Sequence, residues 1–159
     1  MAKVNIKQGK GFITEATAEH IEQIYPFMRK ADQIEIACMG QHTPKEALEC
    51  ALKQDDLTLT ALDSEGVPIA MFGVGQVGAQ AYIWLLGTDS VTDNAYDFLK
   101  ASRKWTQILT EPYGATFNFV HEQTDVAIKW LKFCGAKFLR KLTFNNEPFF
   151  EFIIAYKHV

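Results

Sequence analysis

The sequence predicts a single α/β domain whose sheet is mixed and mostly antiparallel. Residues 115–142 read as a strand, a polar turn, an amphipathic helix, a glycine stop and a further strand. Residues 57–61 alternate with a period of two, and a DSEG turn then leads into a near-continuous apolar run over 67–74, which together are typical of an antiparallel hairpin. Helical patterns precede and separate these strands, so we expect helices packed on one sheet.

Composition places the chain among ordinary globular proteins. Its 159 residues are 48% hydrophobic and 22% charged, which argues against disorder. They contain no repeat, low-complexity tract or interdomain linker, so we expect one domain over residues 1–159. The formal charge of -3 provides no general electrostatic reason to bind nucleic acid or an anionic membrane.

Cysteine usage and hydropathy indicate a protein made in the cytoplasm. Cys38, Cys50 and Cys134 are an odd number without metal spacing, so we expect reduced, packed thiols and no metal. No apolar run has the length of a signal peptide core or approaches the roughly 18 residues of a membrane helix.

The N-terminal part carries a short strand and two helices. A strand over residues 12–15 is followed by a helix that begins at Ala18 with Thr17 as its N-cap. Pro26 removes a backbone donor and clashes with the preceding turn, so it predicts a break before a second helix. Apolar residues of that second helix share one face: Ala31, Ile34 and Cys38.

A capping box and two turns organise the middle of the chain. The sequence TPKE at 43–46 predicts the start of a third helix. A strand from Leu57 and an apolar run over 67–74 form the hairpin, and a glycine-containing link leads to a strand over 81–86. Gly87 ends that strand.

The C-terminal half alternates helices and strands. It is predicted to contain a helix over 93–109, a strand over 115–121 and a helix over 124–134. A strand over 137–142, an FNNEP turn and a last strand with the sequence FFEFIIAY complete the chain.

The segment VHEQTDVAIKWLKFCGAKFLRK resembles the last helical motif of the GNAT family of acetyl-CoA-dependent acyltransferases. In that motif an alanine, two apolar positions and a glycine followed by an apolar residue recur at this spacing. The order of predicted elements is also similar to that of a GNAT domain. The resemblance implies that strands 81–86 and 115–120 are parallel neighbours, with the helix over 93–109 as their crossover. They would separate at their C-terminal ends into a V-shaped cleft.

A narrower resemblance rests on four blocks that cover most of residues 29–138. They are RKADQIEIACMGQHTPKEAL, GVPIAMFGVG, WLLGTDSV with FLKASRKW, and TFNFVHEQTDVAIKWLKFCGAKF. In their order and spacing the chain resembles GNAT-like proteins of tailed phages and prophages, which are related to an internal virion protein of short-tailed coliphages.

The resemblance also locates a cofactor site. GNAT enzymes bind the CoA pyrophosphate with a glycine-rich turn of Q/R-x-x-G-x-G/A type, whose backbone donors point at the phosphates. Here the turn reads LGTDSV and has a single glycine beside Asp89, with Asp93 close behind. We therefore expect acetyl-CoA to bind weakly or not at all. The residues that the resemblance places against it are Leu85, Leu86, Gly87, Thr88, Val120 and Thr124.

The chain also lacks the tyrosine that acts as a general acid in many GNAT enzymes. Many GNAT enzymes place a tyrosine four residues before the helix-ending glycine, where it protonates the leaving thiolate, but this chain has Leu131 there. His121, at the end of its strand, and the adjacent Glu122 are the candidate catalytic residues. The alternative for His121 is a solvent-exposed histidine without a catalytic role.

Two further groups have both a functional and a structural interpretation. Asp32 and Glu35 are three residues apart on one helical face, where they would either receive an amine substrate at the mouth of the cleft or simply be solvated. Cys134 is expected to be a packed thiol. Trp84 is expected in the core, with the lining of a pocket as the alternative.

These observations predict a phage or prophage protein of GNAT fold that acts by protein contacts in the virion or its assembly. The partners would be phage virion or assembly proteins, and the location the host bacterial cytoplasm or the virion. The alternative is a divergent acetyl-CoA-dependent N-acetyltransferase of a small or protein amine. A third hypothesis is an inhibitor that binds a host protein. A fold by itself decides none of these.

Overall fold

A computed structural model describes residues 5–8, 11–40, 43–93 and 95–157. The strands are β1 (Asn5–Gln8), β2 (Gly11–Glu15), β3 (Leu57–Leu62), β4 (Pro68–Val77), β5 (Gln80–Gly87), β6 (Ala115–His121), β7 (Lys137–Phe144) and β8 (Glu147–Ala155). The helices are α1 (Ala18–Ile24), α2 (Lys30–Met39), α3 (Pro44–Gln54), α4 (Ser90–Asp93), α5 (Ala95–Thr110) and α6 (Asp125–Phe133), with 3-10 turns η1 (Tyr25–Phe27) and η2 (Glu111–Tyr113).

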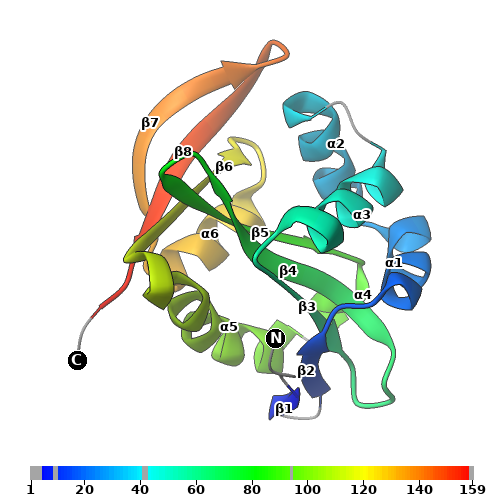
Figure 1. The fold of residues 1–159 in the computed structure, drawn as a ribbon. Coiled ribbons are helices and arrows are strands. Elements are labelled where there is room, and N and C mark those ends of the chain that lie inside the picture. The colour runs from blue at the N-terminus through cyan, green and yellow to red at the C-terminus, as the bar shows by residue number, and fades with distance from the viewer. Residues whose placement is uncertain (1–4, 9–10, 41–42, 94, 158–159) are drawn as a thin grey trace.

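The strands form one mixed sheet in the order β1-β2-β3-β4-β5-β6-β8-β7. Figure 1 shows α1, α2 and α3 on one side of this sheet and α5 and α6 on the other. Every adjacent pair is antiparallel except β5 and β6. The prediction of a mixed, mostly antiparallel α/β domain is therefore confirmed.

Two hairpins follow the predicted turn signals. β3 pairs with β4 across the DSEG turn, with Leu57 opposite Val74. β7 pairs with β8 across Asn145 and Asn146, which both have positive φ, a conformation that asparagine tolerates better than most residues. The strand β1 was not predicted, because its residues lack alternation between polar and apolar side chains.

The predicted helix starts at Thr17 and Thr43 are confirmed, whereas Thr124 precedes α6 without a side-chain cap hydrogen bond. The Thr17 hydroxyl accepts the backbone N–H of His20 at 3.3 Å, and the Thr43 hydroxyl accepts that of Glu46 at 3.2 Å. Pro26 lies in η1, which interrupts the helical path between α1 and α2 as expected. The helix predicted over 93–109 is found as α4 followed by α5.

The face of α2 that packs inward is not the apolar one. Ile34 is 41% exposed, whereas Asp32 is only 6% exposed. The physical reason is the position of the helix over the parting strands, where carboxylates find backbone N–H groups to bind. The interpretation of Asp32 as a solvated residue is therefore wrong.

The core has one cluster on each face of the sheet. The larger cluster packs β-strand residues against α5 and α6, with Trp105 and Leu131 among its members. The smaller one packs Met71 against α1 and α3, through Ile24 and Leu48. Members of the larger cluster on β5 and β6, Ile83 and Val120, also line a cavity.

Candidate functional site

The parallel strands β5 and β6 part soon after they meet. Among the described residues they form a single paired position, Tyr82 opposite Phe117, near the N-terminal end of each strand. Beyond it the Asn118 side chain reaches across and donates to the Ile83 carbonyl at 2.6 Å. No further pairing joins these strands toward their C-terminal ends, so they separate there as predicted.

A cavity of about 480 Å³ occupies the opening between the two strands. Residues of both strands line it, including Leu85, Leu86 and Val120. Helices α2 and α3 on one face of the sheet and α5 and α6 on the other also contribute to its wall, as do residues of β2, β3, β4 and β8. The cavity therefore has walls from both faces of the sheet.

Helix α2 connects the ends of the two separated strands. The Gly87 N–H, at the end of β5, donates to the Asp32 carboxylate at 2.8 Å. The His121 N–H, at the end of β6, donates to the Glu35 carboxylate at 3.0 Å. Arg29 binds the Asp32 carboxylate through its Nε and Nη2 atoms at 2.9 to 3.1 Å. The two carboxylates thus link α2 to both sides of the opening.

Glu35 is the carboxylate best placed to exchange a proton at neutral pH. It lines the cavity, and burial raises its pKa to about 7, although the N–H bond from His121 partly opposes the shift. Burial likewise raises the pKa of Asp32, with Arg29 opposing it. A carboxyl group with a pKa near neutrality in a cavity is suited to general acid or base chemistry.

A third carboxylate, Asp55, lines the same cavity near the place where the strands meet. The Tyr82 hydroxyl donates to one of its oxygens, and the Trp84 indole N–H donates to the other at 2.6 Å. Burial raises the pKa of Asp55, while these two bonds lower it. Trp84, expected in the core, packs partly buried against the smaller core cluster and also lines the cavity, which was the alternative.

The turn after β5 has already used several of its backbone donors. The Gly87 N–H binds Asp32, and the Thr88 N–H binds the Ile69 carbonyl at 2.9 Å. The Ser90 N–H binds the Thr88 hydroxyl at 3.3 Å. A diphosphate at this turn would have to compete with these internal acceptors.

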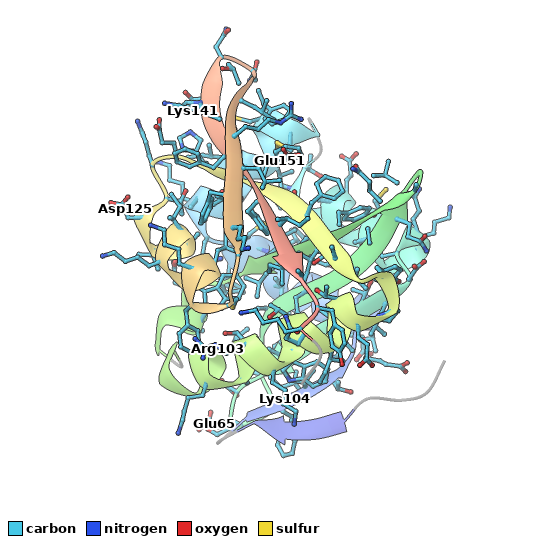
Figure 2. The ribbon with its side chains drawn as sticks, turned by 90° about the vertical axis from the view of Figure 1, so that its left-hand side faces the viewer. Glu65, Arg103, Lys104, Asp125, Lys141 and Glu151 are labelled. Carbon is cyan, nitrogen blue, oxygen red and sulfur yellow. The ribbon has the colours of Figure 1, made fainter. Side chains whose placement is uncertain are left out.

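The predicted catalytic residues lie beside the cavity and not in its wall. His121 is 6% exposed, so the alternative of a solvent-exposed histidine is wrong. Its ring lies edge-on to Phe149, with the Nε2 atom 3.4 Å from Glu147. Glu122 pairs with Lys141 at 2.7 Å, and Figure 2 shows Lys141 near the top of the β7–β8 ribbon. The catalytic role of this pair remains a prediction.

The predicted cofactor residues divide into two groups. Leu85, Leu86 and Val120 line the cavity, whereas Gly87, Thr88 and Thr124 do not. Leu131, in place of the family's tyrosine, also lines the cavity and is 6% exposed. Cys134 is 3% exposed beside Ser102, and burial raises the pKa of its thiol, as expected for a packed cysteine.

Reasoning from sequence missed Asp55 as a site residue, because it stands at the end of α3 with nothing nearby in sequence to indicate burial. Its bonds join residues 27 and 29 positions apart, which local patterns do not report. Glu35 was recognised through its spacing from Asp32, but its contact with β6 spans 86 positions.

The described part of the chain contains neither a cluster of potential metal ligands nor a helix that could span a membrane. No group of three or more potential metal ligands gathers among those residues. None of the helices described is both long enough and apolar enough to cross a lipid bilayer.

Comparisons by sequence find no relative: no protein-family model matches the chain, and no curated protein does. Solved structures do match. A GNAT-family acetyltransferase from Bacillus anthracis has a TM-score of 0.73 at 8% identity, covering 98% of this chain and 100% of that one. Ard1 from Thermoplasma volcanium has a TM-score of 0.70 at 12% identity, covering 94% and 99%.

A ribosomal-protein-S5-alanine acetyltransferase from Vibrio fischeri matches with a TM-score of 0.67 at 10% identity, covering 96% of this chain and 97% of that one. These structures show that the chain has the GNAT fold. None of the three is a phage protein, so the phage relationship remains a prediction.

Proposed function

We propose that this protein is an N-acyltransferase that uses an acyl-CoA donor and an amine acceptor, the two meeting in the opening between β5 and β6. The observation that carries the proposal is the cavity itself: it has walls from both faces of the sheet where the parallel strands part, and Glu35 lines it. The structural neighbours are acetyltransferases, which supports the same reaction class.

The reaction needs a base and a path for the proton. An acyl-CoA supplies a thioester carbonyl carbon, to which the amine nitrogen adds as the carbon–sulfur bond breaks. Glu35 accepts the proton that the nitrogen loses, because its carboxyl group has a pKa of about 7 and faces the cavity. Leu131 cannot donate a proton to the leaving thiolate, so we expect slow turnover.

The donor would be held mainly by the strands. Backbone groups of β5 beyond Ile83 have no partner on β6, so they can pair with the amide groups of a pantetheine arm. The turn after β5 contributes little to phosphate binding, since Asp32 and Ile69 already accept its first donors. We therefore expect a dissociation constant for acetyl-CoA above the micromolar range, weaker than about -8 kcal/mol.

The proposal is tested by acyl transfer from acetyl-CoA to a panel of amines, with thiol release as the signal. Replacing Glu35 by Gln should lower turnover by about 100- to 10,000-fold, the usual contribution of a general base. The control is Glu49→Gln, which removes an exposed carboxylate from α3. The wild-type rate should rise with pH through about 7, because the ionised carboxylate is the base.

The same assay compares Glu35 with the alternative bases, His121 and Glu122. If His121→Ala or Glu122→Gln abolishes turnover while Glu35→Gln leaves it intact, the sequence-based assignment replaces that of Glu35. If the protein neither binds acetyl-CoA nor releases thiol with any acceptor, the acyltransferase proposal is refuted.

The turn after β5 favours a second candidate function. Its engaged donors and single glycine are what a domain that has lost acyl transfer would show, which favours a protein that acts by contacts with other proteins. That these partners are phage virion or assembly proteins, or a host protein, remains a prediction from the sequence. Mass spectrometry of purified virions and of tagged protein from infected cells tests this. Stoichiometric phage partners would support it, and acetylated products without a stable partner would refute it.

A further inference from the structure

Asp55 and Glu35, two of the carboxylates that line the cavity, lie at different levels along the strands. Asp55 binds Tyr82 and Trp84, so it lies at the level of the strand junction. Glu35 binds His121, four residues beyond the junction at Phe117. With a rise of about 3.3 Å per residue, the two levels are separated by roughly 13 Å along the strand direction.

Asp55 has no cationic partner among the described residues. It accepts from a hydroxyl and an indole N–H. Glu35 accepts from a backbone N–H, and Arg29, which hydrogen-bonds to Asp32, is close enough to lower the pKa of Glu35. A cationic ligand would supply the missing counter-charge at Asp55.

The wall around Asp55 suits an organic cation. Tyr82 and Trp84 are aromatic and line the cavity together with apolar side chains of α2 and α3, Ile36, Met39 and Ala51. Aromatic faces attract ammonium groups, and the apolar side chains suit a hydrocarbon body. A hydrated inorganic cation would gain little from such walls.

The opposite wall of the cavity contains an unsatisfied donor. The Trp105 indole N–H has no hydrogen-bond partner among the described residues, although the residue is only 4% exposed and lines the cavity. Buried donors of this kind are normally satisfied. Because the nitrogen itself is shielded, a bound molecule would reach it only after neighbouring side chains moved.

We propose that the acceptor is a bifunctional organic cation, such as an aliphatic diamine, whose retained ammonium group binds Asp55 beside Tyr82 and Trp84 while its second nitrogen reacts near Glu35. A nitrogen paired with Asp55 keeps its proton and is no nucleophile, so the reacting nitrogen is the other one. The separation of the carboxylates suits a spacer of about four to six methylene groups. The identity of the reaction rests on the proposed function, whereas the binding site does not.

The first test measures binding alone, without acyl-CoA. Calorimetry compares cadaverine, a five-carbon diamine, with pentylamine and pentanol on the wild-type protein, Asp55→Asn and Asp56→Asn. Asp56 is the matched control, because it is exposed and bound by Tyr113 and Gln76 outside the cavity wall. We expect cadaverine to bind at least tenfold more tightly than pentanol, and Asp55→Asn but not Asp56→Asn to remove that preference.

A second measurement covers the case in which Asp55→Asn fails to fold. Cys50 lines the cavity and Cys38 does not, and both are free thiols of intermediate exposure. Cadaverine should slow the alkylation of Cys50 in the wild-type protein at least fivefold and leave Cys38 unchanged, as read by mass spectrometry. Equal protection by cadaverine and pentanol, or none by either, would overturn the proposal.

An assay of acyl transfer tests the cation site and the proposed acyltransferase function separately. Cadaverine binding that depends on Asp55, in a protein that transfers no acyl group, would refute the proposed function and leave the cation site standing. Transfer to monoamines as fast as to diamines, unchanged in Asp55→Asn, would overturn the diamine acceptor and leave the acyltransferase standing. Efficient transfer to diamines that is lost in Asp55→Asn supports both.

Discussion

Replacing Glu35 by Gln should stabilise the fold at alkaline pH while it removes the proposed base. Burial holds the pKa of Glu35 at about 7 in the folded protein, against an ordinary value of 4.5. Its carboxylate accepts the His121 N–H, and the carbonyl oxygen of Gln can accept the same bond. The substitution therefore removes the cost of burying a charge and keeps the hydrogen bond.

The direction in which stability changes with pH follows from proton linkage. Between pH 4.5 and 7 the folded protein holds a proton at Glu35 that the unfolded chain has lost. The contribution of this group is fully present below the unfolded pKa and is lost as pH rises through the folded one. The slope is about 1.4 kcal/mol per pH unit, so the whole window amounts to about 3 kcal/mol.

Urea denaturation of the wild-type protein and Glu35→Gln from pH 4 to pH 9 measures this directly. The two free energies of unfolding should be close below pH 4.5, and the variant should be more stable by about 3 kcal/mol above pH 7. Glu49→Gln, on the exposed face of α3, should show no such pH-dependent difference in the free energy of unfolding. A difference that does not change with pH, or a variant less stable at pH 8, would refute the burial argument.

Three further substitutions test the packing around the site. Thr110→Val should cost about 1–3 kcal/mol, because it leaves the Thr116 hydroxyl, 2.9 Å away, buried without its partner; denaturation of the double valine variant should recover most of the loss. Leu48→Ala should cost about 2–5 kcal/mol in the same assay, since Leu48 is 0% exposed in the smaller core cluster, and a cost below about 1 kcal/mol would contradict that packing. Gly75→Ala should weaken cadaverine binding, because the new Cβ would lie 2.5 Å from Asp55 and against the Tyr82 hydroxyl. Unchanged affinity would show that Asp55 and Tyr82 do not bind the ligand.

The sequence determined those elements whose cause is local. Thr17 and Thr43 satisfy the first N–H groups of their helices wherever those helices pack, and Pro26 interrupts a helix in any context. The asparagines at 145 and 146 form their turn through conformational preferences of their own backbone. Period-two alternation likewise located the hairpin between β3 and β4.

Local pattern could not determine which face of α2 is buried. Its apolar residues predict an inward face that includes Ile34, yet Asp32 is the buried side chain. Hydrophobic periodicity assumes that a helix packs against apolar surface. This helix instead spans the ends of two parting strands, whose unpaired N–H groups favour carboxylates.

Tertiary structure also decided the chemistry of the site. Nothing in the sequence around Glu35 distinguishes it from a surface glutamate, and its pKa of about 7 arises from burial in the fold, where it also accepts the N–H of His121, 86 positions along the chain. Asp55 faces the cavity only because β5 brings Tyr82 and Trp84 against the end of α3. Sequence patterns report what a residue does to its neighbours along the chain, whereas burial and charge balance depend on neighbours that only folding supplies.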